Sequence, residues 1–126
     1  MAASVFFVVE LDVQPGQADA LRQVAREMVD LSQANEPGTL NYEYFLSADG
    51  STCHIFERYM DIDALQRHSE SFPPELSRRA QSFRPRRLTA YGKVPEEVRA
   101  QRVDPIRQAV PGFTAAYMEP LSGFSR

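Results

Sequence analysis

At 126 residues, with 43% hydrophobic and 25% charged residues, the chain has the size and composition of one globular domain, which excludes the disordered and fibrous classes. Its formal net charge of −3 argues against a nucleic-acid-binding protein, because such proteins need clustered basic residues to neutralise phosphates. The single cysteine cannot form an internal disulfide, and the only histidines, His54 and His68, have no clear third partner for a metal site.

The N-terminal apolar run, residues 5–9, is shorter than the core of a signal peptide, has no basic residue before it and ends at Glu10. No stretch approaches the length that spans a bilayer. We therefore expect a cytoplasmic protein that binds neither a membrane nor nucleic acid.

The first predicted element is a strand over residues 4–13, rich in β-branched and aromatic residues. Its odd-numbered positions, from Val5 to Val13, share one apolar face, whereas Phe6 and Val8 lie on the other face. A sheet covered by helices on one side would leave Phe6 and Val8 in water. A second layer, such as another subunit, is expected to cover them.

An amphipathic helix is predicted over residues 17–34, and two strands follow at 39–47 and 52–60. Asp49 and Gly50 between the strands are typical of a hairpin turn. Both faces of the second hairpin strand mix apolar and charged residues. Periodicity therefore does not tell which face lines a pocket.

Asp61 is the predicted N-cap of a helix over residues 62–70, and a shorter helix at 75–83 precedes a strand at 84–94. The order strand, helix, strand, strand, helix, strand is typical of an α+β, ferredoxin-like βαββαβ fold with an antiparallel sheet.

The last segment, residues 95–126, extends beyond what that fold needs. A helix is predicted to begin at Pro95 and break near Pro105, and a strand is predicted at 113–118. We expect this C-terminal helix and strand extension to pair with an exposed sheet edge, in its own subunit or in a partner. Residues 1–94 and the extension 95–126 are thus parts of one domain.

Three motifs carry a family resemblance: EPG at 36–38, FERY at 56–59 and DIDALQRH at 61–68. With them, the chain resembles the antibiotic biosynthesis monooxygenase family. The resemblance implies a dimeric α+β barrel, in which two ferredoxin-like sheets pack face to face. Relatives include cofactor-independent oxygenases of phenolic polyketides, quinol oxidases, haem-degrading enzymes and an isomerase of a sugar phosphate.

The resemblance implies a substrate-driven oxygenation that needs a base, donors for an oxyanion and a dry pocket, with no bound cofactor or metal. His68 is the candidate base, because it matches the family position and histidine changes its charge near neutral pH. Tyr59 is a candidate oxyanion donor and Glu57 a second base. Each also has a structural interpretation, as a packed histidine, a core tyrosine and an ion-paired carboxylate.

Four aromatic residues are candidate walls of a substrate pocket, although an ordinary core is the commoner role of such residues: Tyr42, Tyr44, Phe56 and Phe72.

We expect from these residues and the resemblance a homodimeric, cofactor-independent monooxygenase for a small aromatic, phenolic or quinol compound. The alternatives are a non-catalytic small-ligand-binding or stress-associated dimer, and an isomerase of the same fold.

Overall fold

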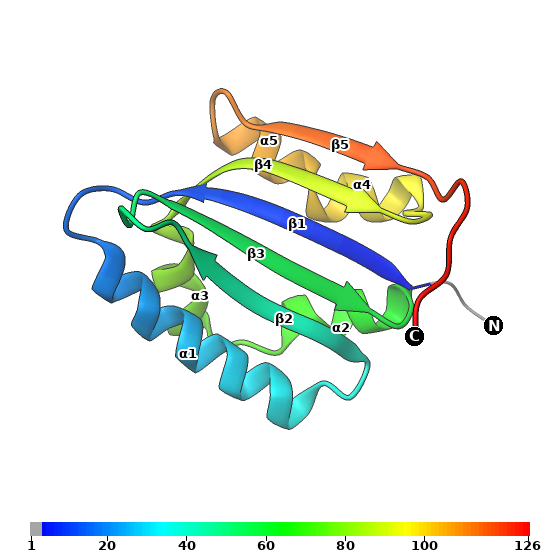
Figure 1. Cartoon of the computed structure of the whole chain (residues 1–126), viewed down its shortest axis with the longest axis horizontal. Helices are drawn as coiled ribbons and strands as arrows, with labels where there is room; N and C mark the ends of the chain where they lie inside the picture. Colours follow the sequence, from blue (N-terminus) through cyan, green and yellow to red (C-terminus); the bar gives the residue numbers. More distant parts are fainter. Residues whose placement is uncertain (1–3) are drawn as a thin grey trace.

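The computed structural model describes residues 4–126, which form one five-stranded sheet and a layer of helices (Figure 1). The mixed α+β, ferredoxin-like architecture that the sequence predicts is confirmed. The elements are β1 (Val5–Asp12), α1 (Ala18–Asn35), β2 (Thr39–Leu46), β3 (Thr52–Tyr59), α2 (Ile62–Glu70), α3 (Pro74–Gln81), β4 (Arg84–Tyr91), α4 (Glu96–Arg102), α5 (Asp104–Ala109) and β5 (Thr114–Met118).

The strand order in the sheet is β2-β3-β1-β4-β5. The first four strands are antiparallel to their neighbours, whereas β5 runs parallel to β4 at the edge of the sheet. The C-terminal strand therefore pairs with an edge in its own subunit. None of the helices in residues 4–126 has the length and hydrophobicity to cross a membrane.

The hairpin turn and the start of α2 form as their side chains predict. Asp49 accepts hydrogen bonds from the hydroxyl and backbone N–H of Ser51 and from the Ser47 hydroxyl, which together lower the pKa of Asp49 to about 2. Gly50 completes the turn at φ 75°. Asp61 caps α2, because its carboxylate accepts from the backbone N–H of Ala64 at 2.9 Å.

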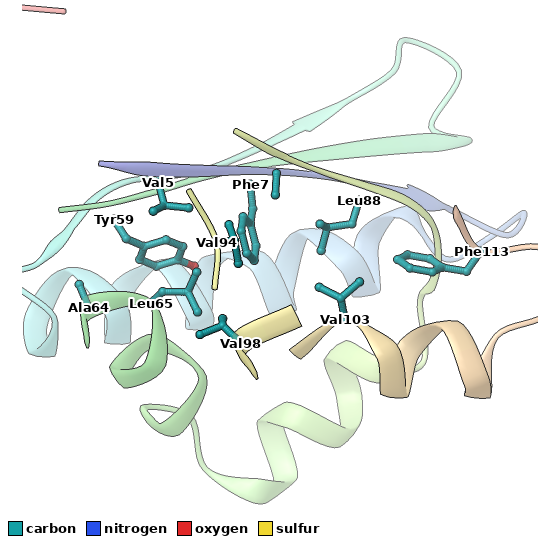
Figure 2. Packing of buried hydrophobic residues seen from close by; sticks show 11 residues of the cluster. Val5, Phe7, Tyr59, Ala64, Leu65, Leu88, Val94, Val98, Val103 and Phe113 are labelled. Atoms are coloured by element: carbon teal, nitrogen blue, oxygen red, sulfur yellow. The ribbon is translucent and has the colours of Figure 1, made fainter. Parts of the chain in front are cut away.

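The helix-facing side of the sheet carries the core, which Figure 2 shows with the helices on one side of the strands. One hydrophobic cluster joins Val5, Phe7 and Tyr59 to α2 and α4, and it includes Val98 and Val103 from the C-terminal extension. A second cluster lies under the other end of the sheet, between α1, α3 and β3. The extension thus supplies part of the core.

The opposite face of the sheet, which we call the open face, also carries apolar side chains. Phe6 and Val8 are half-buried, while Phe45 and Phe56 are 52% and 40% exposed and pack edge to face. Glu10 of β1 lies within ion-pair distance of two basic side chains of neighbouring strands on this face. The apolar character of both faces of β1 follows the sequence prediction.

Gly38 lets α2 approach the start of β2 closely. A Cβ atom at Gly38 would lie 2.7 Å from the Cβ of Ala64 and 3.3 Å from the Sδ of Met60. Because Ala64 belongs to the first turn of α2, a side chain at Gly38 would push the helix away from the sheet.

We expect Gly38→Ala to lower the free energy of unfolding by about 1–3 kcal/mol, because the added methyl overlaps a packed helix. Urea denaturation would measure the loss. In the double variant Gly38→Ala, Ala64→Gly, the overlap disappears, so the two losses should be clearly less than additive. Strict additivity would contradict the close packing of these two positions.

Candidate functional site

His68 lies on the buried side of α2, close to the sheet and to the end of α1. His68 is 8% exposed, and its ring packs against three aromatic rings. Tyr42 and Phe72 meet it edge to face, with ring centroids at 4.6 and 5.0 Å, and Tyr59 lies at 5.3 Å. Few orientations of the imidazole fit among these rings.

The Nδ1 side of the imidazole faces Glu36, the residue that follows α1. Glu36 Oε1 lies 2.7 Å from His68 Nδ1 and accepts a hydrogen bond of 2.7 Å from the Thr39 hydroxyl. Burial acts to raise the pKa of Glu36, but the Thr39 hydrogen bond and the charge and hydrogen bond of His68 lower it below its ordinary value. Glu36 is therefore a buried carboxylate that stays ionised.

The Nε2 side of the imidazole faces Glu57 of β3, whose Oε1 lies 3.5 Å away. Tyr59 donates a hydrogen bond from its hydroxyl to the same oxygen. Burial raises the pKa of Glu57, although the charge of His68 and the Tyr59 hydrogen bond act to lower it. Glu57 is thus the carboxyl of this site that favours its neutral form.

Glu36 and Glu57 consequently have opposite tendencies on the two sides of one histidine. Environments that move the pKa values of two carboxyl groups apart are a signature of acid–base sites. Because the carboxylates lie on opposite sides of the ring, they do not converge on one point. Within residues 4–126, no group of three histidine, cysteine or acidic side chains is arranged to hold a metal ion.

A cavity of about 290 Å³ opens next to His68 and Glu57, and its lining holds this one histidine and this one carboxyl group. Its walls are mostly apolar and come from the sheet, α1, α3 and the connection after α2. The lining includes Leu21, Val24, Met28, Tyr42, Tyr44, Ile55, Phe72 and Phe83. A larger hollow of about 480 Å³ lies on the open face around Phe45 and Phe56, but it contains no buried titratable group.

Tyr42 and Tyr44 form one wall of the cavity, and their hydroxyl groups hydrogen-bond to each other at 2.8 Å. Both hydroxyls also lie close to the sulfur of Met28. Burial raises the pKa of both tyrosines, so they remain neutral. Tyr42 and Tyr44 therefore give this wall an aromatic surface with hydroxyl groups at one edge.

Five of the seven residues that the sequence identifies border this cavity: His68, Glu57, Tyr42, Tyr44 and Phe72. Tyr59 does not. Its ring is 1% exposed and belongs to the core cluster, and its hydroxyl is directed to Glu57.

Phe56 lies away from the site because side chains alternate along β3. Glu57 points toward the helices, so Phe56 points to the open face, where it contacts Phe45.

Sequence reasoning missed Glu36 as a site residue, although it begins the EPG motif at 36–38. Glu36 and His68 are far apart in sequence, and only the packing of α2 against the start of β2 brings them together. A charged residue directly after an amphipathic helix usually indicates solvent exposure. The available signal was its place in a motif shared with a family.

Comparisons with known proteins agree with this fold. The family model described as antibiotic biosynthesis monooxygenase matches residues 4–81. MupZ from Pseudomonas fluorescens is 20% identical, with a TM-score of 0.74 over 98% of this chain and 95% of its own. Rv0793 from Mycobacterium tuberculosis is 27% identical, with a TM-score of 0.57 over 75% of this chain and 98% of its own.

PA3566 from Pseudomonas aeruginosa is 22% identical, with a TM-score of 0.56, and the match covers 71% of this chain and 91% of that one. No curated protein sequence matches the chain significantly. MupZ is matched over nearly the whole chain, which includes the C-terminal extension.

The raised pKa of Glu57 predicts that the free energy of unfolding depends on pH. The native state binds this proton more tightly than the unfolded chain, so the stabilisation is complete below the ordinary pKa of 4.5 and is lost as the pH rises through the raised value. The stability of Glu57→Gln relative to wild type should therefore be higher at about pH 8 than at about pH 5, because only the wild type loses this stabilisation as the pH rises. The difference is about 1.4 kcal/mol for each unit of pKa shift that the pH range covers.

Urea unfolding at both pH values would measure this difference. Glu97→Gln, on the exposed side of α4, is the matched control for the loss of one carboxylate. An equal pH dependence in the two variants would contradict a raised pKa of Glu57.

Proposed function

Because the chain belongs to the antibiotic biosynthesis monooxygenase family, we propose that it is an oxygenase of a small aromatic, phenolic or quinol compound, and that the substrate itself supplies the electrons for oxygen. The observation that carries this proposal is the pair of His68 Nε2 and Glu57 at the end of an apolar cavity. A proton acceptor and a neutral donor beside a dry aromatic wall are what such a reaction needs.

In the first step, His68 Nε2 takes the proton of a phenol or enol bound in the cavity. The oxyanion that forms lies next to Glu57, whose neutral carboxyl group donates a hydrogen bond to it. A carboxyl group kept neutral by burial is an effective oxyanion donor in a low-dielectric site. Tyr59 keeps Glu57 in place through the hydrogen bond to Oε1.

In the second step, the electron-rich carbanion form of the substrate reacts with molecular oxygen. Electron transfer and recombination give a peroxide anion at the activated carbon, which takes the proton back from His68. The resulting hydroperoxide loses water to leave a carbonyl group. Overall, a CH₂ group and O₂ become a C=O group and H₂O, so no external reductant is needed.

The cavity supports a small aromatic substrate. Its volume of about 290 Å³ is at the lower end of the range of about 300–1,000 Å³ for ligand pockets. Tyr42, Tyr44 and Phe72 provide surfaces against which a ring can stack or meet edge to face. The walls contain few polar groups, which suits an apolar body with one or two hydroxyl groups.

Isomerisation is the second candidate function, because Glu57, whose pKa is raised by burial, lies beside His68 in the same cavity. Removal of a proton by His68 and its return at another carbon would use the same base and the same oxyanion donor, without oxygen. The two functions share the first step and differ in whether oxygen is consumed.

We also propose that the protein is a homodimer that joins two copies through the open face. Phe6, Val8, Phe45 and Phe56 form an apolar area there that a second sheet would bury. Stable dimers bury about 800 Å² per subunit. Covering this face would leave the cavity accessible, because it lies on the helical side of the sheet.

Oxygen uptake with a panel of hydroquinones, anthrones and enols tests the oxygenase. We expect turnover in the wild type and a loss of about 100-fold or more in kcat for His68→Ala, because a general base contributes about 10²–10⁴-fold. His54→Ala removes the other histidine, on the open face, and serves as the matched control. Conversion of substrate without oxygen uptake would indicate the isomerase, and ligand binding without any product the non-catalytic alternative.

Sedimentation analysis tests the dimer. We expect the wild type to sediment as a dimer at micromolar concentrations, and Phe56→Glu to sediment as a monomer because it places a charge in the interface. Leu121→Glu, a similar change at a residue that is 98% exposed in the C-terminal tail, controls for added charge. A wild type that is monomeric throughout this range would contradict the proposal.

A further inference from the structure

Glu36 is an unfavourable residue for stability at its position. It is 6% exposed and forms the C-cap of α1, where the negative end of the helix dipole opposes a carboxylate. A buried ionised group needs compensating partners, and an apolar side chain of similar volume is often as stable. Residues that break such local rules are frequently found at functional sites.

The contacts of Glu36 are concentrated on one oxygen. Oε1 receives the Thr39 hydroxyl and faces His68 Nδ1, while Oε2 has no hydrogen-bond partner within residues 4–126. The short contact of 2.7 Å to Nδ1 is possible only if a proton lies between the two atoms. A neutral His68 with its proton on Nε2 would instead place two acceptors against each other.

We propose that Glu36 is a positioning residue for His68: it holds the ring in the tautomer that carries its proton on Nδ1, and it stabilises the imidazolium that forms when Nε2 takes a substrate proton. This tautomer leaves the lone pair of Nε2 on the side of Glu57 and the cavity. The cation forms only if the proposed function holds, whereas the tautomer does not depend on it.

The other groups around the ring do not replace this role. Glu57 lies on the Nε2 side, and Tyr59 is engaged with Glu57 through its hydroxyl. Tyr42 meets the ring edge to face, and its hydroxyl pairs with Tyr44. Among these groups, only Glu36 contacts Nδ1. The choice of tautomer therefore rests on this carboxylate.

Nitrogen NMR of histidine-labelled protein reads the tautomer directly. We expect His68 in the wild type to carry its proton on Nδ1 when the ring is neutral, with His54 as an internal reference for a histidine outside the cavity. In Glu36→Leu, which removes the acceptor, His68 should change to the Nε2-protonated form. Glu36→Gln keeps an oxygen that can accept from Nδ1 but removes the charge, so the tautomer should persist.

Oxygen-uptake measurements then give the effect of the Glu36 variants on kcat. We expect kcat to fall about 100-fold or more in Glu36→Leu, through the wrong tautomer, and to fall less in Glu36→Gln. Glu27→Gln removes a carboxylate elsewhere on α1 that pairs with Arg79 and should leave both readouts at the wild-type values.

A wild-type His68 protonated on Nε2, or a Glu36→Leu variant with an unchanged tautomer, would overturn the positioning role. If Glu36→Leu does not fold, a Glu36→Gln variant with wild-type kcat overturns the stabilisation of the cation. A tautomer change on substitution without oxygen uptake in any variant would support the positioning role and count against the oxygenase.

Discussion

Two buried carboxyl groups, Glu36 and Glu57, lie on opposite sides of the His68 ring, and the packing of several elements holds them there. A charged group in the core is tolerated only when its partners are held in place. Here the partners come from the end of α1, from β2, from β3 and from α2, so their distances depend on how closely α2 packs against the sheet. The absence of a side chain at Gly38 permits that contact, two residues after Glu36.

Local signals explain why most of the fold could be predicted from the sequence. Asp61 caps its helix with its own side chain, and Asp49 and Gly50 form the hairpin turn within residues 47–51. Both features could therefore be predicted without tertiary information. The parallel pairing of β5 with β4 could not be predicted in this way. It depends on how α4 and α5 pack under the sheet, since they place β5 at the edge with its direction already set.

The sequence reveals which residue types can carry the chemistry of the candidate site, but not the role that each one has there. His68 and Glu57 carry chemistry that a sequence reveals, but the tendency of Glu57 toward its neutral form results from burial, which only the fold determines. Tyr59 has the hydroxyl of an oxyanion donor, yet the core encloses it behind Glu57. Glu36 escaped notice because its partner lies in another element.

The alternation of side chains along β3 links the site to the open face. Ile55, Glu57 and Tyr59 point toward the helices, whereas His54, Phe56 and Arg58 point away from them. A shift of one residue in the pairing of β3 would move Glu57 out of the site and place an aromatic or basic side chain beside His68. The pairing of β3 with β1 and β2 therefore fixes the acid–base site and the proposed dimer surface together. A change in that register would alter both surfaces at once.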